Sequence, residues 1–308
     1  MQLSTMQEKL VELSELSKSY PGLDRPAVSK LSLTLRRGDI FGFVGPNGAG
    51  KTTTIKMLMN LAKPDGGSGK IFGLDIERDS VAIRRRIGFM SGEVNLWGSM
   101  RGKDLLSFLL SLHGGGDQQK LQDLCRRFEV PLDRKVKTYS SGQKQMVALL
   151  AATAHASDLL ILDEPTKGLD PSKKTQFLEL VQSWREQGGA VIISSHVLSE
   201  IEAICTRVGF IREGKLLGEE EIDRIKQELD NSIFVSFDTE ITQAQLLALP
   251  GVAEVVSHGR EFLLSVEGDG REVLRRLADM PVCSLRYRAA ALDEIYEKLF
   301  IGQERTGR

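Results

Sequence analysis

A glycine-rich segment between an apolar run and a helical pattern is the strongest chemical signal in the sequence. Residues 45–53 read GPNGAGKTT and match G-x-x-x-x-G-K-[ST], with Gly45, Gly50, Lys51 and Thr52 at the fixed positions. Glycines let backbone N–H groups curl around phosphate oxygens, and the start of a helix adds partial positive charge. The segment therefore predicts a loop that binds the phosphates of a nucleotide.

The residues of this loop have different expected roles. Lys51 can reach the β- and γ-phosphates, and the hydroxyl of Thr52 can coordinate Mg²⁺. The alternative is a chance glycine-rich turn, which the apolar run Asp39 to Val44 before the loop and the helical pattern after it argue against. The residues expected to contact the nucleotide here are Gly45, Pro46, Asn47, Gly48, Ala49, Gly50, Lys51, Thr52 and Thr53.

Two adjacent acids follow a second apolar strand. The segment LLILDEP, residues 159–165, places Asp163 at the C-terminal end of a strand, where α/β sheets bind ligands. A carboxylate there can hold Mg²⁺, and Glu164 can orient and deprotonate a water molecule. Taken alone, the segment fits an acid that caps a helix equally well. The phosphate loop, about 110 residues earlier, favours the catalytic interpretation.

The ordered set of motifs resembles the ABC ATPase family over about Leu10 to Leu217. YSSGQ, residues 139–143, resembles the family signature LSGGQ and departs from it at Tyr139 and Ser141. His196 ends a strand after the acidic pair, as the family's switch histidine does. Tyr20 precedes the phosphate loop by about 25 residues, like the aromatic residue that stacks on adenine; a tyrosine at a strand end is also often only a packing residue.

This resemblance implies ATP and Mg²⁺ as the ligands and ATP hydrolysis as the reaction. Glu164 would act as general base, His196 would hold the γ-phosphate, and Lys51 would neutralise phosphate charge. A buried or capped strand-end histidine is the alternative for His196 on its own. Mg²⁺ would be held by Thr52 and Asp163, with Glu93 as a further candidate.

The signature segment suggests a second anion site. Ser140 and Gly142 stand just before a helix, where a hydroxyl and exposed N–H groups can bind an anion. One chain cannot easily bring this site onto its own phosphate loop if the family geometry holds, so the resemblance implies two domains arranged head to tail. The residues expected to complete the partner's site are Ser140, Ser141, Gly142, Gln143 and, in the D-loop GLD at 168–170, Asp170.

One stretch departs from the family pattern. The family places a glutamine after the strand at 86–90, but here the sequence reads GFMSGEVNLW, with Gly92 at that position and Glu93 next. In the family this glutamine links the γ-phosphate to the transport partner. Either Glu93 takes over its contact with Mg²⁺ or water, or that link is made differently. The alternative for Glu93 is a solvated loop acid. Leu96 and Trp97 follow in an expected exposed loop, which suggests a surface that contacts a partner.

The pattern of elements predicts an α/β fold: a P-loop NTPase domain of the ABC ATPase type, with a mostly parallel sheet, over residues 1–227. Expected strands lie at 11–20, 31–35, 39–44, 86–90, 159–162, 190–194 and 208–211. Expected helices lie at 51–61, 105–112, 118–128, 142–155, 171–187 and 197–204.

The pattern changes after about residue 227, and residues 228–308 predict a small α+β domain. The expected order is strand 233–237, helix 242–249, strand 252–257, strand 261–266, helix 271–278 and strand 283–287. This βαββαβ order is typical of a ferredoxin-like unit. His258 and Gly259 suggest a tight turn, and a last helix would align Leu292, Ile295, Tyr296 and Leu299 on one face.

Composition limits the possible partners. The chain has 308 residues, a formal net charge of −1, 41% hydrophobic and 27% charged residues, so no global charge favours nucleic acid. We expect no signal peptide, because the N-terminal segment carries Glu8, Glu12 and Glu15 and has no apolar central stretch. We expect no spanning helix, since the longest apolar run, Met146 to Ala154, has about half the length required. Cys125, Cys205 and Cys283 show no metal or disulfide spacing, and we expect buried or half-buried thiols.

The leading hypothesis is an ATP-hydrolysing subunit that powers a membrane transporter. The C-terminal domain resembles the accessory region of exporter ATPases paired with ABC-2 permeases. We therefore expect a separate transmembrane permease, a homodimer or a pair with a related ATPase, and a cytoplasmic location at the inner face of the membrane. The alternatives are a soluble ABC ATPase acting on ribosomes or nucleic acid, and a regulator that binds ATP without turnover; Glu164 argues against the second.

Overall fold

The chain forms two compact units, one ending at Glu219 and the other beginning at Glu220. The structure, a computed structural model, describes residues 8–112, 114–115, 118–154, 158–225, 232–258, 261–267 and 270–287. No helix in this part of the chain is both long and apolar enough to span a bilayer.

A six-stranded sheet forms the centre of the first unit, in the order β10-β9-β3-β8-β7-β6. The strands from β9 to β6 run parallel to one another, as the sequence predicted. Val44 pairs with Ser195, and Asp163 pairs with Ser194, so the C-terminal ends of three strands meet at one edge. The strands are β3 (Ile40–Val44), β6 (Ile87–Met90), β7 (Leu159–Asp163), β8 (Ala190–Ser195), β9 (Arg207–Arg212) and β10 (Lys215–Glu221).

A second, antiparallel sheet shares a core with one face of the central sheet. Its order is β2-β1-β4-β5, from β1 (Lys9–Lys18), β2 (Val28–Arg36), β4 (Gly66–Ile71) and β5 (Leu74–Asp75). Helix α1 (Lys51–Leu58) contributes to the same core, which includes Leu13, Leu33, Phe43, Ile55 and Ile161. Burial of these apolar side chains fixes α1, and with it the preceding loop, against the central sheet.

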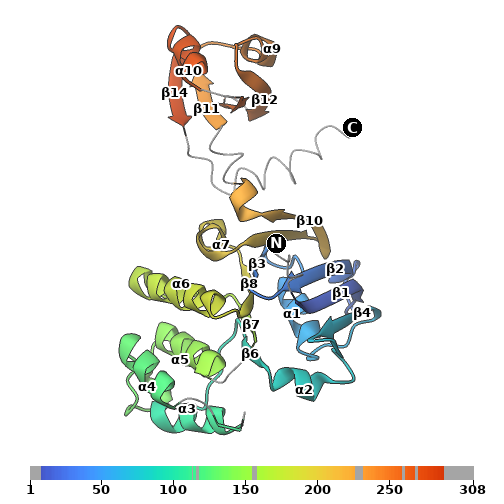
Figure 1. The fold of residues 1–308 in the computed structure, drawn as a ribbon, viewed down its shortest axis with the longest axis vertical. Helices are drawn as coiled ribbons and strands as arrows, with labels where there is room; N and C mark the ends of the chain where they lie inside the picture. The colour runs from blue at the N-terminus through green and yellow to red at the C-terminus, as the bar shows by residue number, and fades with distance from the viewer. Residues whose placement is uncertain are drawn as a thin grey trace, which may run out of the picture. The chain divides into compact units, whose positions relative to one another are not determined.

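Helices cover the opposite face of the central sheet. Helices α5 (Ser141–Ala154) and α6 (Pro171–Glu186) lie across the strands from β1, β2 and β4 (Figure 1). Helix α7 (Leu198–Ile204) packs closely on β3 at Gly42, where a Cβ would lie 2.7 Å from Ile201 Cγ2 and 3.0 Å from Cys205 Sγ. The missing side chain at Gly42 therefore sets the separation between β3 and α7.

Shorter helices extend the first unit beyond the sheet. Helices α3 (Gly102–Ser111) and α4 (Gln118–Arg127) pack on α5. A one-turn 3₁₀-helix, Val136–Thr138, leads into the YSSGQ segment, and α2 (Ser80–Arg84) precedes β6. Tyr139 is buried there, and its hydroxyl donates to the carbonyl of Pro131.

The second unit is a four-stranded antiparallel sheet in the order β12-β13-β11-β14. One face packs on two helices through a core that includes Ile233, Val235, Leu264, Val273 and Leu277. Its elements are β11 (Ser232–Phe237), α9 (Gln243–Leu247), β12 (Val252–His258), β13 (Glu261–Val266), α10 (Arg271–Ala278) and β14 (Val282–Tyr287). The expected turn at Gly259 and the expected helix at 292–299 lie outside the described residues.

One expectation about the cysteines is wrong. Cys125 and Cys205 are buried, but Cys283 on β14 is exposed. Burial raises the pKa of the Cys125 thiol to about 11. Cys283 lies on a short strand at the edge of the sheet, where alternate side chains need not face the core.

Candidate functional site

A cleft of about 680 Å³ gathers most of the predicted site residues. The phosphate loop forms one wall, and the residues after β7 and β8 form another. Leu23 and Ala27 also line the cleft close to Tyr20 in sequence. The predicted residues that line it are Tyr20, Asn47, Gly48, Ala49, Gly50, Lys51, Thr52, Thr53, Glu93, Asp163, Glu164 and His196.

The start of α1 presents its N–H groups without a capping side chain. Gly50 is the N-cap residue and has φ +113°, a conformation that favours glycine, and no side chain accepts a hydrogen bond from the helix start. A Cβ at Gly50 would also lie 2.5 Å from the Ala27 carbonyl oxygen. Since the first N–H groups of a helix have no partner within it, this helix start is suited to an anion.

Lys51 is held by the loop that precedes it. Its side chain is only 6% exposed, and Nζ donates to the carbonyl oxygens of Gly45 at 2.5 Å and Pro46 at 3.2 Å. Nζ lies 3.9 Å from Glu164 Oε1. Burial lowers the pKa of Lys51, while the negative charges of Glu164 and Asp163 act in the opposite direction. The loop carbonyls thus orient the ammonium group toward the cleft's acidic residues.

Asp163 is a buried carboxylate with a hydroxyl group on either side. Thr52 Oγ1 donates to Oδ2 at 3.0 Å, and Ser194 Oγ donates to Oδ1 at 2.5 Å. A Cβ on Gly92 would lie 3.2 Å from Oδ2, so the glycine leaves this oxygen accessible. A hydroxyl and a carboxylate beside a phosphate loop are oxygen ligands that suit Mg²⁺. Among the described residues there is no group of three His, Cys, Asp or Glu side chains that could hold a metal ion.

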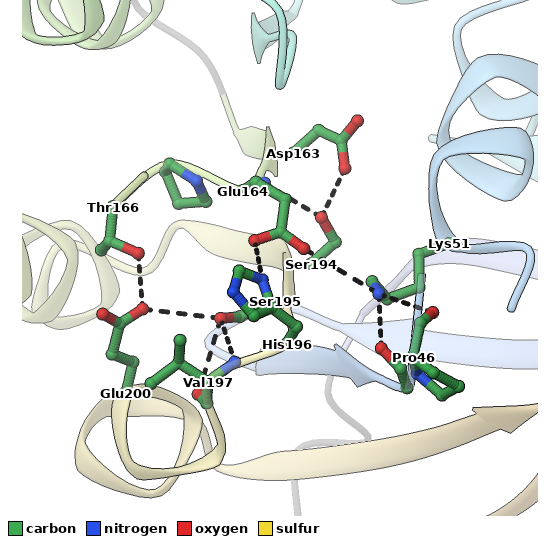
Figure 2. Close-up of polar contacts among 12 residues, drawn as sticks. Pro46, Lys51, Asp163, Glu164, Thr166, Ser194, Ser195, His196, Val197 and Glu200 are labelled. Atoms are coloured by element: carbon green, nitrogen blue, oxygen red, sulfur yellow. Dashed lines mark hydrogen bonds and ion pairs between the residues drawn. The ribbon is translucent and has the colours of Figure 1, made fainter. Parts of the chain in front are cut away.

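Glu164 and His196, which both line the cleft, form a hydrogen-bonded pair (Figure 2). Glu164 Oε2 lies 2.8 Å from His196 Nδ1. Glu164 has a left-handed backbone with φ +47°, and its N–H donates to Ser194 O at 3.1 Å and to Ser194 Oγ at 3.0 Å. Its carbonyl oxygen accepts from Gln145 Nε2 at 3.1 Å. The carboxylate is therefore positioned from both its backbone and its side chain.

The signature residues do not line the cleft of their own chain. Ser140 Oγ accepts from the Gln143 N–H at 3.2 Å, and Gln143 Oε1 accepts from the Ser140 N–H at 3.1 Å. This reciprocal pair caps the start of α5. A Cβ on Gly142 would lie 2.8 Å from the Gly168 carbonyl oxygen, so the signature helix and the GLD segment are in contact.

Asp170 is likewise outside the cleft wall and caps α6. Its Oδ1 accepts from the Lys173 N–H at 3.0 Å, and its Oδ2 accepts from Lys173 Nζ at 3.0 Å. These bonds lower the pKa of Asp170. The structure thus separates the predicted residues into a set that lines the cleft and a set that does not, which comprises residues 140–143, Asp170, and Gly45 and Pro46 of the phosphate loop.

Ser194 is a site residue that the sequence analysis missed. It is fully buried and contacts both Asp163 and Glu164. The available signal was a hydroxyl residue two positions before His196, on a strand expected to end beside the acidic pair. Lys56, Ser91 and Lys167 also line the cleft and were not singled out.

Of the two apolar residues expected to be exposed after Glu93, Trp97 is exposed and Leu96 is only half-buried. Trp97 is 54% exposed and packs edge to face against Phe108 of α3, with ring centroids 5.5 Å apart. Leu112, one turn further along from Phe108, is 61% exposed. These three side chains form an exposed apolar patch next to the cleft segment that contains Glu93.

A parallel sheet whose strand β3 leads through a glycine loop into α1, with Asp163 opposite Thr52, defines a P-loop nucleotide-binding domain. Residues 28–167 match the family model described as ABC transporter. The bacitracin transport ATP-binding protein BcrA of Bacillus licheniformis is 36% identical over 221 residues, covering 71% of this chain and 72% of BcrA. The chain therefore belongs to the ATP-binding proteins of ABC transporters.

Two further comparisons cover different lengths of the chain. The daunorubicin/doxorubicin resistance ATP-binding protein DrrA of Streptomyces peucetius is 29% identical over 309 residues, covering 96% of this chain and 93% of DrrA. A solved structure of the ATP binding subunit of an ABC transporter has a TM-score of 0.66 and 26% identity, covering 71% of this chain and 92% of its own. ATP binding and ATP hydrolysis in support of transport are the activities of this family, to which the chain belongs.

Proposed function

We propose that the chain binds Mg·ATP in this cleft, hydrolyses it, and powers an ABC-2-type exporter whose membrane-spanning part is a separate permease subunit. The observation that carries the proposal is the presence of Lys51, Thr52, Asp163, Glu164 and His196 in one cleft. Each supplies a different group that phosphoryl transfer to water requires.

Binding of the triphosphate falls to the phosphate loop. The uncapped N–H groups at the start of α1 and the ammonium of Lys51 bind phosphate oxygens. Thr52 and Asp163 are the residues that would hold Mg²⁺, which supplies positive charge beside those oxygens when it is bound. Tyr20, which lines the cleft, is proposed to contact the adenine. Glu93 lines the same cleft and is proposed to contact the metal or its water.

Glu164 is proposed as the general base. A water oxygen bonds to the γ-phosphorus, the bond between that phosphorus and the β–γ bridging oxygen breaks, and the water proton moves to the Glu164 carboxylate. His196 lies 2.8 Å from this carboxylate and fixes its orientation, and its remaining ring nitrogen is left for the γ-phosphate. ADP and inorganic phosphate are the products.

A second copy is proposed to complete the site. The start of α5 and Asp170 carry groups suited to phosphate contact but lie outside the cleft of their own protomer. A head-to-tail dimer would place Ser140, Ser141, Gly142 and Gln143 of one copy over the phosphate loop of the other. The Ser140 hydroxyl accepts a bond from Gln143 and keeps its own proton to donate to a phosphate oxygen.

The exposed patch of Trp97, Phe108 and Leu112 is the proposed contact with the permease. Exposed aromatic and aliphatic side chains in one patch are typical of a protein-interaction surface. We place the chain at the inner face of the membrane, attached through this permease. The named roles of BcrA in bacitracin transport and of DrrA in daunorubicin and doxorubicin resistance support an exporter.

Residues 228–308, which lie within the second unit, are proposed to form a ferredoxin-like domain. If the four strands are numbered by their order in the chain, they lie across the sheet in the order 4-1-3-2, which supports that assignment. We propose that it packs on its twin and holds the dimer together between cycles. Deleting residues 230–308 should weaken self-association in analytical ultracentrifugation, and unchanged self-association would contradict this role.

ATPase assays on three variants test the proposed reaction. Glu164→Gln removes the base and should lower turnover about 10²–10⁴-fold while ATP binding is kept. Lys51→Ala should lose ATP binding. Lys9→Ala removes an exposed lysine of β1 that pairs with Glu12, and serves as a control with wild-type turnover. Equal turnover in wild type and Glu164→Gln would reject Glu164 as base.

Co-purification tests the partner. The full chain should be recovered with a membrane-spanning protein from membranes, and a Trp97→Ala, Phe108→Ala double variant should lose that association while its ATPase activity is kept. Recovery with ribosomes or nucleic acid instead would favour the soluble alternative.

A further inference from the structure

Ser194 joins the two acids of the site through a single hydroxyl (Figure 2). Its Oγ donates to Asp163 Oδ1 at 2.5 Å and accepts from the Glu164 N–H at 3.0 Å. The parallel register of β7 and β8 places Ser194 directly beside Asp163. Ser194 is fully buried, so water does not compete for these bonds.

The first bond determines which way the Asp163 carboxylate faces. Ser194 donates to Oδ1, while the Thr52 hydroxyl lies nearer to Oδ2, at 3.0 Å, than to Oδ1, at 3.3 Å, and Oδ2 lies beside Gly92. Turning the carboxylate plane out of this orientation would break the hydrogen bond from Ser194 and weaken the contacts with Thr52. The hydroxyl of Ser194 therefore holds one carboxylate oxygen of Asp163 and keeps the other on the side of Thr52, where Thr52 and Asp163 would share a metal ion.

The second bond acts on the neighbouring residue. Glu164 has φ +47°, which is costly for a residue with a side chain, and its N–H is held by both Oγ and O of Ser194. This backbone conformation aims the Glu164 carboxylate at His196, 2.8 Å away. One residue on β8 thus acts on the metal-binding acid through its side chain and on the general base through the backbone.

We propose that Ser194 is a positioning residue for hydrolysis: it fixes Asp163 for Mg²⁺ and Glu164 for water without touching either ligand itself. This inference rests on the proposed function, since it assigns Ser194 a role toward the metal that Asp163 would hold. It predicts that loss of the hydroxyl weakens the magnesium-dependent part of ATP binding and leaves the magnesium-independent part unchanged.

Ser194→Ala is a clean test because it removes one oxygen atom. The Glu164 N–H keeps the Ser194 backbone oxygen as acceptor, and Asp163 keeps Thr52, so no buried group is left without a partner. Thr153→Val is the matched control. Thr153 is equally buried, at 1% exposure, but its hydroxyl bonds only to carbonyls of its own helix, those of Leu149 and Leu150.

The measurement is equilibrium binding of radiolabelled ATP to the full chain carrying Glu164→Gln, which prevents turnover. Binding is measured in EDTA and across a Mg²⁺ titration. With Ser194→Ala added, ATP affinity in EDTA should match the parent, and the Mg²⁺ midpoint should rise about 10–100-fold, as when the partner of a metal ligand is removed. With Thr153→Val added, the midpoint should stay at the parent value.

Two results would overturn the inference: a parental Mg²⁺ midpoint in Ser194→Ala, or an equal rise in Thr153→Val. Thermal melts of both variants show whether a change follows from lost stability. If Ser194→Ala proves too unstable to measure, Ser194→Cys, whose thiol is a weaker donor, should raise the midpoint in the same direction, and a parental midpoint there would equally reject the role.

Asp163→Asn separates failure of this inference from failure of the proposed function. If Asp163→Asn raises the Mg²⁺ midpoint but Ser194→Ala does not, only the role of Ser194 is wrong. If neither variant changes it, Asp163 is not the metal-binding acid, and the proposed site itself is wrong.

Discussion

Helices α1 and α5 both begin at a segment that the sequence marks as an anion site, yet the two helix starts are built differently. The start of α1 has Gly50 at its N-cap, no capping side chain, and a place in the wall of the cleft. The start of α5 is capped by the reciprocal pair of Ser140 and Gln143 and lies outside that wall. Both segments were predicted to bind an anion, but the start of α1 is uncapped and the start of α5 is already capped by a side chain.

The difference indicates a division of labour. An uncapped helix start with a lysine beside it can bind a triphosphate within a single protomer. A capped start has one N–H already satisfied and offers a hydroxyl proton and the remaining N–H groups to a ligand brought from outside. The start of α1 should therefore control the affinity for ATP, and the start of α5 should control turnover once two copies have associated.

Lys51→Ala, at the open start, should have the largest effect. Loss of the ammonium removes charge stabilisation that no other described residue of the loop supplies, so turnover should fall about 10²–10³-fold or more, and the protomer should lose ATP binding. Isothermal titration calorimetry with Mg·ATP measures the loss of binding, and a phosphate-release assay measures the fall in turnover. Full turnover in Lys51→Ala would contradict the whole assignment.

Ser140→Ala, at the capped start, should have a smaller and different effect. ATP binding to the isolated protomer should be unchanged, while turnover should fall about 10–100-fold through loss of a hydrogen bond to a charged group. The lost cap should cost about 1 kcal/mol of stability, measurable by urea unfolding. Weakened ATP binding in a monomeric sample would mean that the signature acts within its own chain.

Mixing the two variants should restore activity. A dimer with one Lys51→Ala protomer and one Ser140→Ala protomer contains one composite site in which both contributing segments are intact. With random pairing in a symmetric dimer, about a quarter of wild-type activity should return. Activity equal to the average of the two separate variants would contradict a head-to-tail arrangement.

Asp158→Asn should change stability and leave both helix starts intact, so it has the smallest expected effect. Asp158 precedes β7 at the end opposite Asp163 and accepts from Arg86 and Arg37. These bonds, with Arg86 first, lower its pKa from the ordinary 3.8. A carboxylate with a depressed folded pKa contributes stability above pH 3.8, and the contribution is lost as pH falls through the folded value.

The free energy of unfolding of wild type should therefore exceed that of Asp158→Asn by about 0.5–1 kcal/mol at pH 7. This difference should shrink below pH 3.8. Urea unfolding across this range measures it, with ATP turnover at pH 7 expected to stay at the wild-type value. A difference that is constant with pH would exclude the ionised carboxylate as its source.

The parallel strands were predictable because each is a short apolar run, and three of them, β3, β7 and β8, end at a motif. Strand β7 and strand β8 were expected within one residue of their observed ends. The antiparallel sheet was harder to predict, since β4 reads GGSGKI and has little apolar alternation. Its strand character comes from pairing with β1, a tertiary contact that local sequence does not record. The charged strand β10, KLLGEEE, was missed for a similar reason.

The candidate site also contains residues that could be predicted from the sequence and residues that could not. Lys51, Thr52 and Asp163 could be assigned from sequence because their roles follow from local geometry of a loop or a strand end. The link from Ser194 to Asp163 depends on the register between two strands about 30 residues apart, which no spacing rule gives. The capping pair of Ser140 and Gln143 follows the S-x-x-Q pattern, but the anion-site interpretation left that pattern unused.

Gly42 limits how this protein can move. A strand and a helix that approach until even a methyl group would collide cannot slide past each other, because close-packed surfaces resist shear. Strand β3 leads into the phosphate loop, and α7 directly follows the turn after His196. Any displacement that reaches one of these segments must carry the other with it as a rigid pair, so the hinges of the catalytic cycle must lie elsewhere in the chain.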